Sequence, residues 1–212
     1  AALLGTVSHH TLVVAGLVGI VSIGITTVLL VADLGRPERF LNMLRVLRIT
    51  SPMSVGSWVL AANGASLSVA VGADLVGGRL AATVSRLASV ASALLGSVQC
   101  SYPAVLLSCT AVPVWQQSRF SLPLVFVGSA MSSLGSLADL AGVEEPAVQR
   151  FSRAGKVLEL TAALALEKEV RQTASRVARP LREGRSGALW QASLLLTGVS
   201  LTLSLFGKSK GS

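Results

Sequence analysis

The sequence predicts an all-α protein, a polytopic transmembrane helical bundle of about six spanning helices that runs up and down as one integral membrane domain over residues 1–212. Hydrophobic residues make up 51% of the chain, charged residues only 13%, and the mean hydropathy is +0.67. Apolar stretches of about 20 residues recur, and each is long enough to cross a hydrocarbon core of about 30 Å. Abundant glycine, alanine and serine are typical of helices that pack closely in lipid.

Five of the expected spans are predominantly apolar and cover residues 11–32, 53–76, 87–112, 122–141 and 188–206. The sixth, 147–170, has an uncharged core only at 160–166 and carries Lys156 and Glu159 in its middle. A charge at the centre of a lone inserting helix costs about 2.5–3.5 kcal/mol, so this helix needs partners. We expect it to span inside the bundle, and the alternative is a helix that lies on the membrane surface.

The first two spans are joined by a charged segment, DLGRPERFLNMLRVLRITSPMSVGSW, at residues 33–58. Gly35 is expected to adopt the left-handed conformation that ends a helix, and Pro37 to open the next one. Ser51 is expected to cap the second span, with proline at its first position. Between them, residues 37–48 are predicted to form an interfacial amphipathic helix, because apolar side chains recur at helical spacing at Phe40, Leu41, Leu44 and Leu47.

This charged segment resembles the signature loop of the NrfD/polysulfide reductase C family. Two further segments agree: YPAVLLSCTAVPVW at 102–115 and PLVFVGSAMSSLG at 123–135 resemble consecutive helices of that family. The resemblance covers roughly residues 30–166 and is weaker through the last helix. Its members commonly carry additional helices before this hairpin and a longer tail after the last helix, so we expect a chain shortened at both ends, either as a shortened paralogue or by removal of the ends.

The family consists of quinone-interacting membrane subunits of complex iron–sulfur molybdoenzymes. The resemblance therefore implies a membrane anchor in the bacterial cytoplasmic (inner) membrane. Such a subunit exchanges electrons between the menaquinone or ubiquinone pool and a four-cluster iron–sulfur subunit, beside a molybdopterin-type catalytic subunit. The alternative function is a non-catalytic anchor or transporter-like bundle that has lost a working quinone site together with its missing helices.

The residues predict no haem, iron–sulfur cluster or other metal site in this chain. Two membrane-haem ligands must converge from different helices, whereas His9 and His10 are adjacent. Cys100 and Cys109 are nine residues apart and face opposite sides of one helix. The chain is thus expected to be a subunit without a catalytic centre, in which a quinone meets a cofactor of another subunit. Its net charge of +8 is dispersed among apolar spans, which indicates contact with membrane lipid rather than with nucleic acid.

Reduction of a quinone takes two electrons and two protons, so its site needs polar groups for the carbonyls and a protonatable route to water. Asp33, Arg36 and Arg39 lie at the mouth of the first hairpin and are candidates for quinone binding or proton delivery. The alternative is a cluster of charges at a helix end that fixes its depth in the membrane.

Two deeper candidates are Tyr102 and Glu159. Tyr102 is the only tyrosine, lies near the middle of the expected third span and precedes Pro103, which leaves a backbone carbonyl without its helical partner. Its phenol is expected to find a hydrogen-bond partner, either for structure alone or for a carrier or proton. Glu159 is the clearest buried carboxylate, and the alternative to a proton role is a structural ion pair with Lys156.

Four weaker candidates are His9, His10, Asn63 and Gln99. About 35 Å of helix separates the histidines from Asp33, so one copy of the chain cannot use both in one site. Asn63 and Gln99 are expected either to join helices by hydrogen bonds or to line a polar path.

Overall fold

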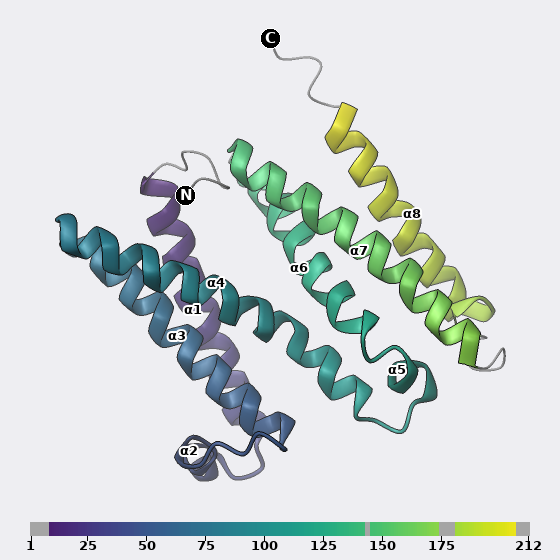
Figure 1. Ribbon diagram of the computed structural model, residues 1–212, viewed down its shortest axis with the longest axis horizontal. Coiled ribbons are helices and arrows are strands. Elements are labelled where there is room, and N and C mark those ends of the chain that lie inside the picture. Colours follow the sequence, from purple (N-terminus) through teal and green to yellow (C-terminus); the bar gives the residue numbers. More distant parts are fainter. Residues whose placement is uncertain (1–8, 143–144, 174–180, 207–212) are drawn as a thin grey trace. The chain divides into compact units, whose positions relative to one another are not determined.

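The computed structural model describes residues 9–142, 145–173 and 181–206, and the side chains of residues 9–12, 39, 43 and 173 lie outside this description. Every regular element in these ranges is helical, and the predicted all-α polytopic fold is confirmed. The elements are α1 His9–Asp33, the 3₁₀ helix η1 Pro37–Arg39, α2 Phe40–Arg45, α3 Pro52–Val76, α4 Arg79–Ser108, α5 Pro113–Gln117, α6 Ser121–Leu140, α7 Pro146–Thr173 and α8 Gly184–Phe206 (Figure 1).

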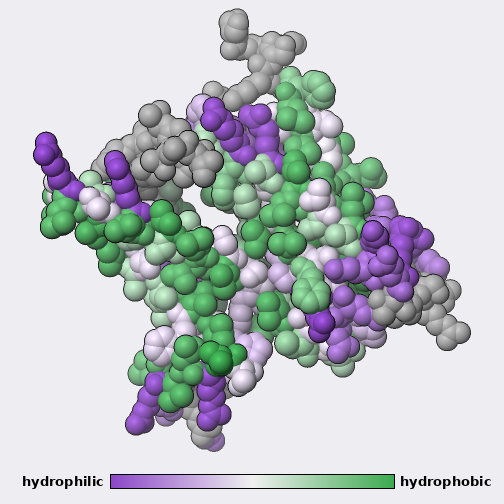
Figure 2. Space-filling model, viewed as in Figure 1, coloured by the Kyte–Doolittle hydropathy of each residue, from purple (hydrophilic) through white to green (hydrophobic). Residues whose placement is uncertain are grey.

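Five of the described helices are long and apolar enough to cross a membrane: residues 13–33 of α1, and α3, α4, α6 and α8. Hydrophobic surface follows these helices, while hydrophilic residues gather at helix ends, including the connector that holds α2 (Figure 2). The exception is α7, which exists as one continuous helix of 28 residues but is too rich in charge to meet the same criteria. Its crossing of the membrane stays a prediction.

The third span differs in its limits from the expected 87–112. Helix α4 begins at Arg79, directly after Gly77 and Gly78, whose φ angles of 73° and 95° break the chain between α3 and α4. It ends at Ser108, where the amide of Thr110 donates to the carbonyl of Leu107 in a tighter turn.

The contacts divide the chain into two compact units, residues 7–99 and residues 100–212 with 1–6, and each is described by itself. In the first unit, α1 packs against α3 in antiparallel fashion through glycines (Figure 1). A Cβ atom at Gly16 would lie 2.4 Å from Val71 Cγ2, and one at Gly19 would lie 2.7 Å from Leu67 Cδ2. These glycines therefore let the two helices approach closely, as small residues do in membrane bundles.

The turn after α1 differs from the prediction at one residue. The prediction of a left-handed Gly35 is wrong, because its φ is not positive. Instead, the amide of Leu34 donates to the carbonyl of Val31 at 3.3 Å, so a 3₁₀-type turn closes the helix without a left-handed residue. Pro37 does open η1, as predicted.

The connector is helical only over 37–45, three residues less than predicted. Ser54 of α3 explains the early end, because its Oγ accepts from the amide of Arg48 at 3.0 Å and donates to the carbonyl of Val46 at 3.3 Å. In a longer connector helix, these two backbone groups would bond to other backbone groups of the helix. Here the Ser54 side chain satisfies them instead. The predicted cap is confirmed: the Ser51 side chain accepts from the amide of Ser54, and proline follows it.

In the second unit, α6 and α7 form an antiparallel pair with small residues at the contact. A Cβ atom at Gly128 would lie 2.5 Å from the backbone nitrogen of Glu159, and one at Gly155 would lie 2.7 Å from that of Ser132. Since backbone meets backbone, neither glycine can be replaced without separating the helices. Helix α7 also contacts α8 and α5, so three elements cover it.

Candidate functional site

The hairpin candidates lie where α1 ends. Asp33 is the last residue of α1, and both it and Arg36 are exposed. No ion pair between them occurs among the side chains that the structure describes. Arg39 closes η1, but its side chain lies outside the described set. This end of α1 is thus an open, charged mouth that a ligand or a partner protein can reach.

His9 and His10 open α1, and their side chains are also outside the described set. They lie at the opposite end of the 25-residue helix from Asp33. Tyr102 is partly buried in the last two turns of α4, nearer the end of the helix than predicted. Its hydroxyl makes no hydrogen bond to any residue within the described ranges, so the expected partner is not present there.

Asn63 and Gln99 are brought together. Asn63 is buried on α3, its Nδ2 donates to Gln99 Oε1 at 2.8 Å, and its Oδ1 accepts from Ser92 Oγ at 2.8 Å. Ser92 and Gln99 are seven residues apart on α4, about two turns, so both face α3. Gly96 lies between them, where a Cβ atom would be 3.8 Å from Asn63 Nδ2. The amide therefore joins two helices.

Glu159 lies on α7 and faces α6. Its Oε2 accepts from Ser132 Oγ at 3.0 Å. Lys156, one turn earlier, is buried with 7% of its surface exposed, and its Nζ lies 3.5 Å from the carbonyl oxygen of Ser200 on α8. Glu159 and Lys156 are therefore held by different helices rather than by an ion pair, which is contrary to the structural alternative considered from sequence.

These two charged side chains share a cavity of about 500 Å³ formed by α6, α7 and α8. Hydroxyl groups supply most of its polar wall, from Ser129, Ser132, Ser133, Ser136, Thr197 and Ser200. Tyr102 does not line it. A lysine, a glutamate and several hydroxyl groups can hold water and pass protons, and Leu137 and Leu196 add apolar surface to the same wall.

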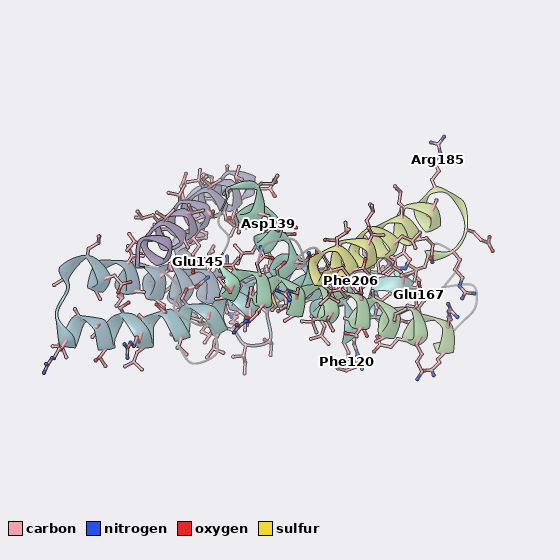
Figure 3. All side chains as sticks on the ribbon, turned by 90° about the horizontal axis from the view of Figure 1, so that it is seen from above. Phe120, Asp139, Glu145, Glu167, Arg185 and Phe206 are labelled. Carbon is pink, nitrogen blue, oxygen red and sulfur yellow. The ribbon has the colours of Figure 1, made fainter. Side chains whose placement is uncertain are left out.

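Glu167, a second carboxylate of α7, has a partner for each of its two oxygens. Glu167 Oε1 accepts from the indole nitrogen of Trp190 on α8 at 3.0 Å, and its Oε2 pairs with Arg171 at 2.9 Å. Figure 3 labels Glu167 on α7, beside α8. Both oxygens thus have partners, which makes Glu167 a structural link between α7 and α8.

No group of three or more histidine, cysteine, aspartate or glutamate side chains that could hold a metal ion occurs in the described part of the chain. Cys100 and Cys109 are free and exposed.

A family model described as polysulphide reductase, NrfD, matches residues 5–144, which is about two thirds of the chain. The chain belongs to the NrfD family. As a family member with five helices suited to crossing a membrane, it is a multi-pass membrane protein. No curated protein and no solved structure matches it.

The NrfD match divides the candidates into two groups. The charged mouth, Asn63, Gln99 and Tyr102 fall inside the matched residues, whereas Glu159 and Lys156 lie beyond residue 144. The resemblance read from sequence extended to residue 166, so the match stops short of α7. The family match therefore says nothing about the role of Glu159 and Lys156.

The burial of Lys156 and the hydroxyl wall around it were not predicted from the sequence. The signal was visible in part: Ser129, Ser132, Ser133 and Ser136 recur at the spacing of one helix face. The partners on α8, Thr197 and Ser200, could not be assigned, because nothing in the sequence indicates which face of α8 meets α7. Ser92 was missed for the same reason.

Proposed function

We propose that this NrfD protein is the membrane anchor and quinone-interacting subunit of a multi-subunit oxidoreductase. In this role it exchanges electrons between the menaquinone or ubiquinone pool and an iron–sulfur partner subunit in the bacterial cytoplasmic membrane. The single observation that carries the proposal is the family match over residues 5–144, which includes the charged hairpin.

The partner subunits that we propose are those that membership of the NrfD family implies. A quinone gives up or takes two electrons, and this chain is proposed to hold no redox centre to receive them. An iron–sulfur subunit with four clusters, coupled to a molybdopterin-type catalytic subunit, would supply the missing electron path. The exposed mouth at Asp33 and Arg36 supports docking of such a partner, since charged and exposed side chains at a helix end can make charge-assisted hydrogen bonds across an interface.

Within the chain, we propose Asp33, Arg36 and Arg39 at the mouth as candidates for quinone binding or proton delivery, and Tyr102 and Glu159 as separate candidates. Arginine stays protonated and can only orient, pair or hydrogen-bond, whereas a carboxyl group can also exchange a proton. Asn63 and Gln99 bond to each other and are better explained as a helix contact.

The experiment has two stages. The chain is first purified from its native membrane in mild detergent, and the co-purifying chains are identified by mass spectrometry. The proposal expects an iron–sulfur protein and a molybdopterin protein in fixed ratio to it. A chain that purifies alone, or with transport proteins, would instead favour the anchor or transporter-like alternative.

In the second stage, the purified complex is titrated with a fluorescent quinol analogue whose emission is quenched on binding. Arg36→Ala should weaken this binding by about tenfold, which corresponds to the loss of one charge-assisted hydrogen bond of about 1.5 kcal/mol. Arg79→Ala is the matched control, because Arg79 is an exposed arginine at the start of α4. Equal affinity in the Arg36 variant, the Arg79 variant and the parent would remove the mouth from the quinone site.

A further inference from the structure

We propose that Lys156 and Glu159 form a proton-exchange site inside the α6–α7–α8 cavity. Glu159 takes up and releases one proton from cavity water, and the ammonium group of Lys156 lines the same cavity. This inference deepens the proposed function. Only the use of the proton in quinone chemistry rests on that proposed function.

Lys156 is the first reason. Its side chain is more than nine-tenths buried, and its single hydrogen bond, to the Ser200 carbonyl, is long at 3.5 Å. An ammonium group has three donors, and a buried charge without an opposite charge costs several kcal/mol. Glu159 lies three residues later, at a spacing that puts side chains of one helix about 5–6 Å apart at Cβ. It is the acidic residue that shares the cavity with Lys156.

Glu159 is the second reason. One of its oxygens, Oε2, accepts from Ser132, while Oε1 has no hydrogen-bond partner among the described residues. The carboxylate therefore has an acceptor position left for water. Glu167, two turns later, differs because both of its oxygens are bonded.

No other titratable side chain of the described residues lines this cavity. On α6 the one titratable residue is Asp139 in the last turn, and it accepts from Gln149. On the described part of α8 it is Arg185 in the first turn, and α5 has none. On α7, Arg153 lies one turn before Lys156 and is absent from the cavity wall. Lys156 and Glu159 are thus the titratable side chains of this cavity among the described residues.

The cavity also has the depth and size that the proposal needs. Its lining residues lie near the middle of α6 and α8, both long and apolar enough to span a membrane. Ionisable groups at such depth are costly and usually functional. A volume of about 500 Å³ is large enough to hold several water molecules.

The exchange step balances with water alone. A hydronium ion in the cavity gives its proton to the carboxylate, which leaves a carboxylic acid and a water molecule. Ser132 keeps its hydrogen bond to the acid, and Lys156 stays protonated throughout. Release is the reverse reaction, so no redox partner is required.

The test uses dicyclohexylcarbodiimide, an apolar reagent that adds to protonated carboxyl groups in membrane proteins. The full-length chain in native membranes is treated over a pH series, and labelled residues are located by mass spectrometry. We expect Glu159 to be labelled, less as pH rises, and Glu167 on the same helix to remain unlabelled. In Lys156→Met, labelling at neutral pH should increase by up to roughly tenfold, because loss of a nearby opposite charge favours the neutral acid. In Lys156→Arg, which keeps the charge, labelling should stay within about twofold of the parent.

Two results would overturn the proposal: no labelling of Glu159 at any pH in the parent protein, or equal labelling in the parent and in Lys156→Met. The parental pH series decides the first point even where a variant fails to fold. Binding of the quinol analogue is measured on the same membranes with Lys156→Met. Unchanged binding together with absent labelling would reject the proton site and leave the proposed quinone function standing.

Discussion

Two helix contacts in this protein bury polar side chains, and they do so in opposite ways. Between α3 and α4, the amide of Asn63 is bonded through both its oxygen and its nitrogen to neutral groups of Ser92 and Gln99. Between α7 and its neighbours, Lys156 and Glu159 are charged, only partly bonded, and open to a cavity. A closed neutral network can only hold helices together, whereas an open charged one can also exchange protons. Burial of a polar residue in a membrane helix therefore does not by itself indicate function.

The largest effect on stability is expected at Gly128, where the backbones of α6 and α7 meet beside Glu159. Gly128→Ala would place a Cβ atom 2.5 Å from the backbone nitrogen of Glu159, and backbone cannot move aside as a side chain can. We expect a loss of about 3 kcal/mol in the free energy of unfolding, at the upper end of the range for overpacking. Unfolding of the purified chain in mixed detergent micelles would measure it. Gly24→Ala is the control, because nothing lies within 4 Å of its Cβ position. Equal stability of the two variants would show that α6 and α7 are not packed this closely.

Loss of the Asn63 hydrogen bonds between α3 and α4 should give the next largest effect on stability. Asn63→Ala leaves Gln99 Oε1 without its donor and Ser92 Oγ without its acceptor. Hydrogen bonds between membrane helices are worth about 0.6 kcal/mol on average and up to about 1.7, so we expect a loss of about 1–2 kcal/mol. A double-mutant cycle with Gln99→Ala would isolate the pair. The comparison further predicts that carbodiimide labelling of Glu159 is unchanged in Asn63→Ala. A coupling energy near zero would reassign Asn63 to a polar path.

A third pair of variants separates the two carboxylates of α7. Glu159→Gln keeps its acceptor for Ser132 and should leave the amount of folded protein unchanged while quinone-linked turnover slows. Glu167→Gln keeps an acceptor for Trp190 but loses the ion pair with Arg171, whose side chain is 51% exposed, so we expect a loss below about 1 kcal/mol. Turnover in Glu167→Gln should stay at the parental rate. Reversed phenotypes would mean that Glu167, not Glu159, is the functional carboxylate.

Much of the fold could be predicted from the sequence, because helix number and helix class depend on local signals. The cap at Ser51 and the proline at the start of η1 are confirmed, since each rests on neighbouring residues. Gly35 was predicted wrongly because a helix can close with a tighter turn, and a single sequence does not decide between the two endings. The connector ended early because Ser54, six residues beyond Arg48, binds its backbone.

The candidate sites were harder to predict, since they depend on which helix faces meet. Glu159 was predicted to be a buried carboxylate from the charge in an apolar stretch, whereas it is half-buried, and its partner Ser132 lies 27 residues away on α6. A structural ion pair with Lys156 was the alternative to a proton role for Glu159, because spacing along one helix was the only available guide. The structure instead gives each charge a contact on a different helix, which spacing alone cannot predict.

The smallest effect on stability is expected at the exposed mouth, where the comparison with the buried sites is sharpest. Asp33 is exposed at the end of α1, so Asp33→Asn should change the free energy of unfolding by less than about 0.5 kcal/mol. Its effect on function should be much larger, because the amide keeps the shape of the carboxylate but cannot take up a proton. We therefore expect normal abundance of the complex on native gels and slower quinol-coupled turnover.

Arg36→Ala should differ by lowering assembly or quinone affinity, since it removes a hydrogen-bonding charge rather than a proton carrier. Abundance and turnover have to be measured on the same preparations, so that slow turnover is not confused with poor assembly. Parental turnover in both Asp33→Asn and Glu159→Gln would show that these carboxylates are structural, and the quinone site would then have to involve residues of a partner subunit.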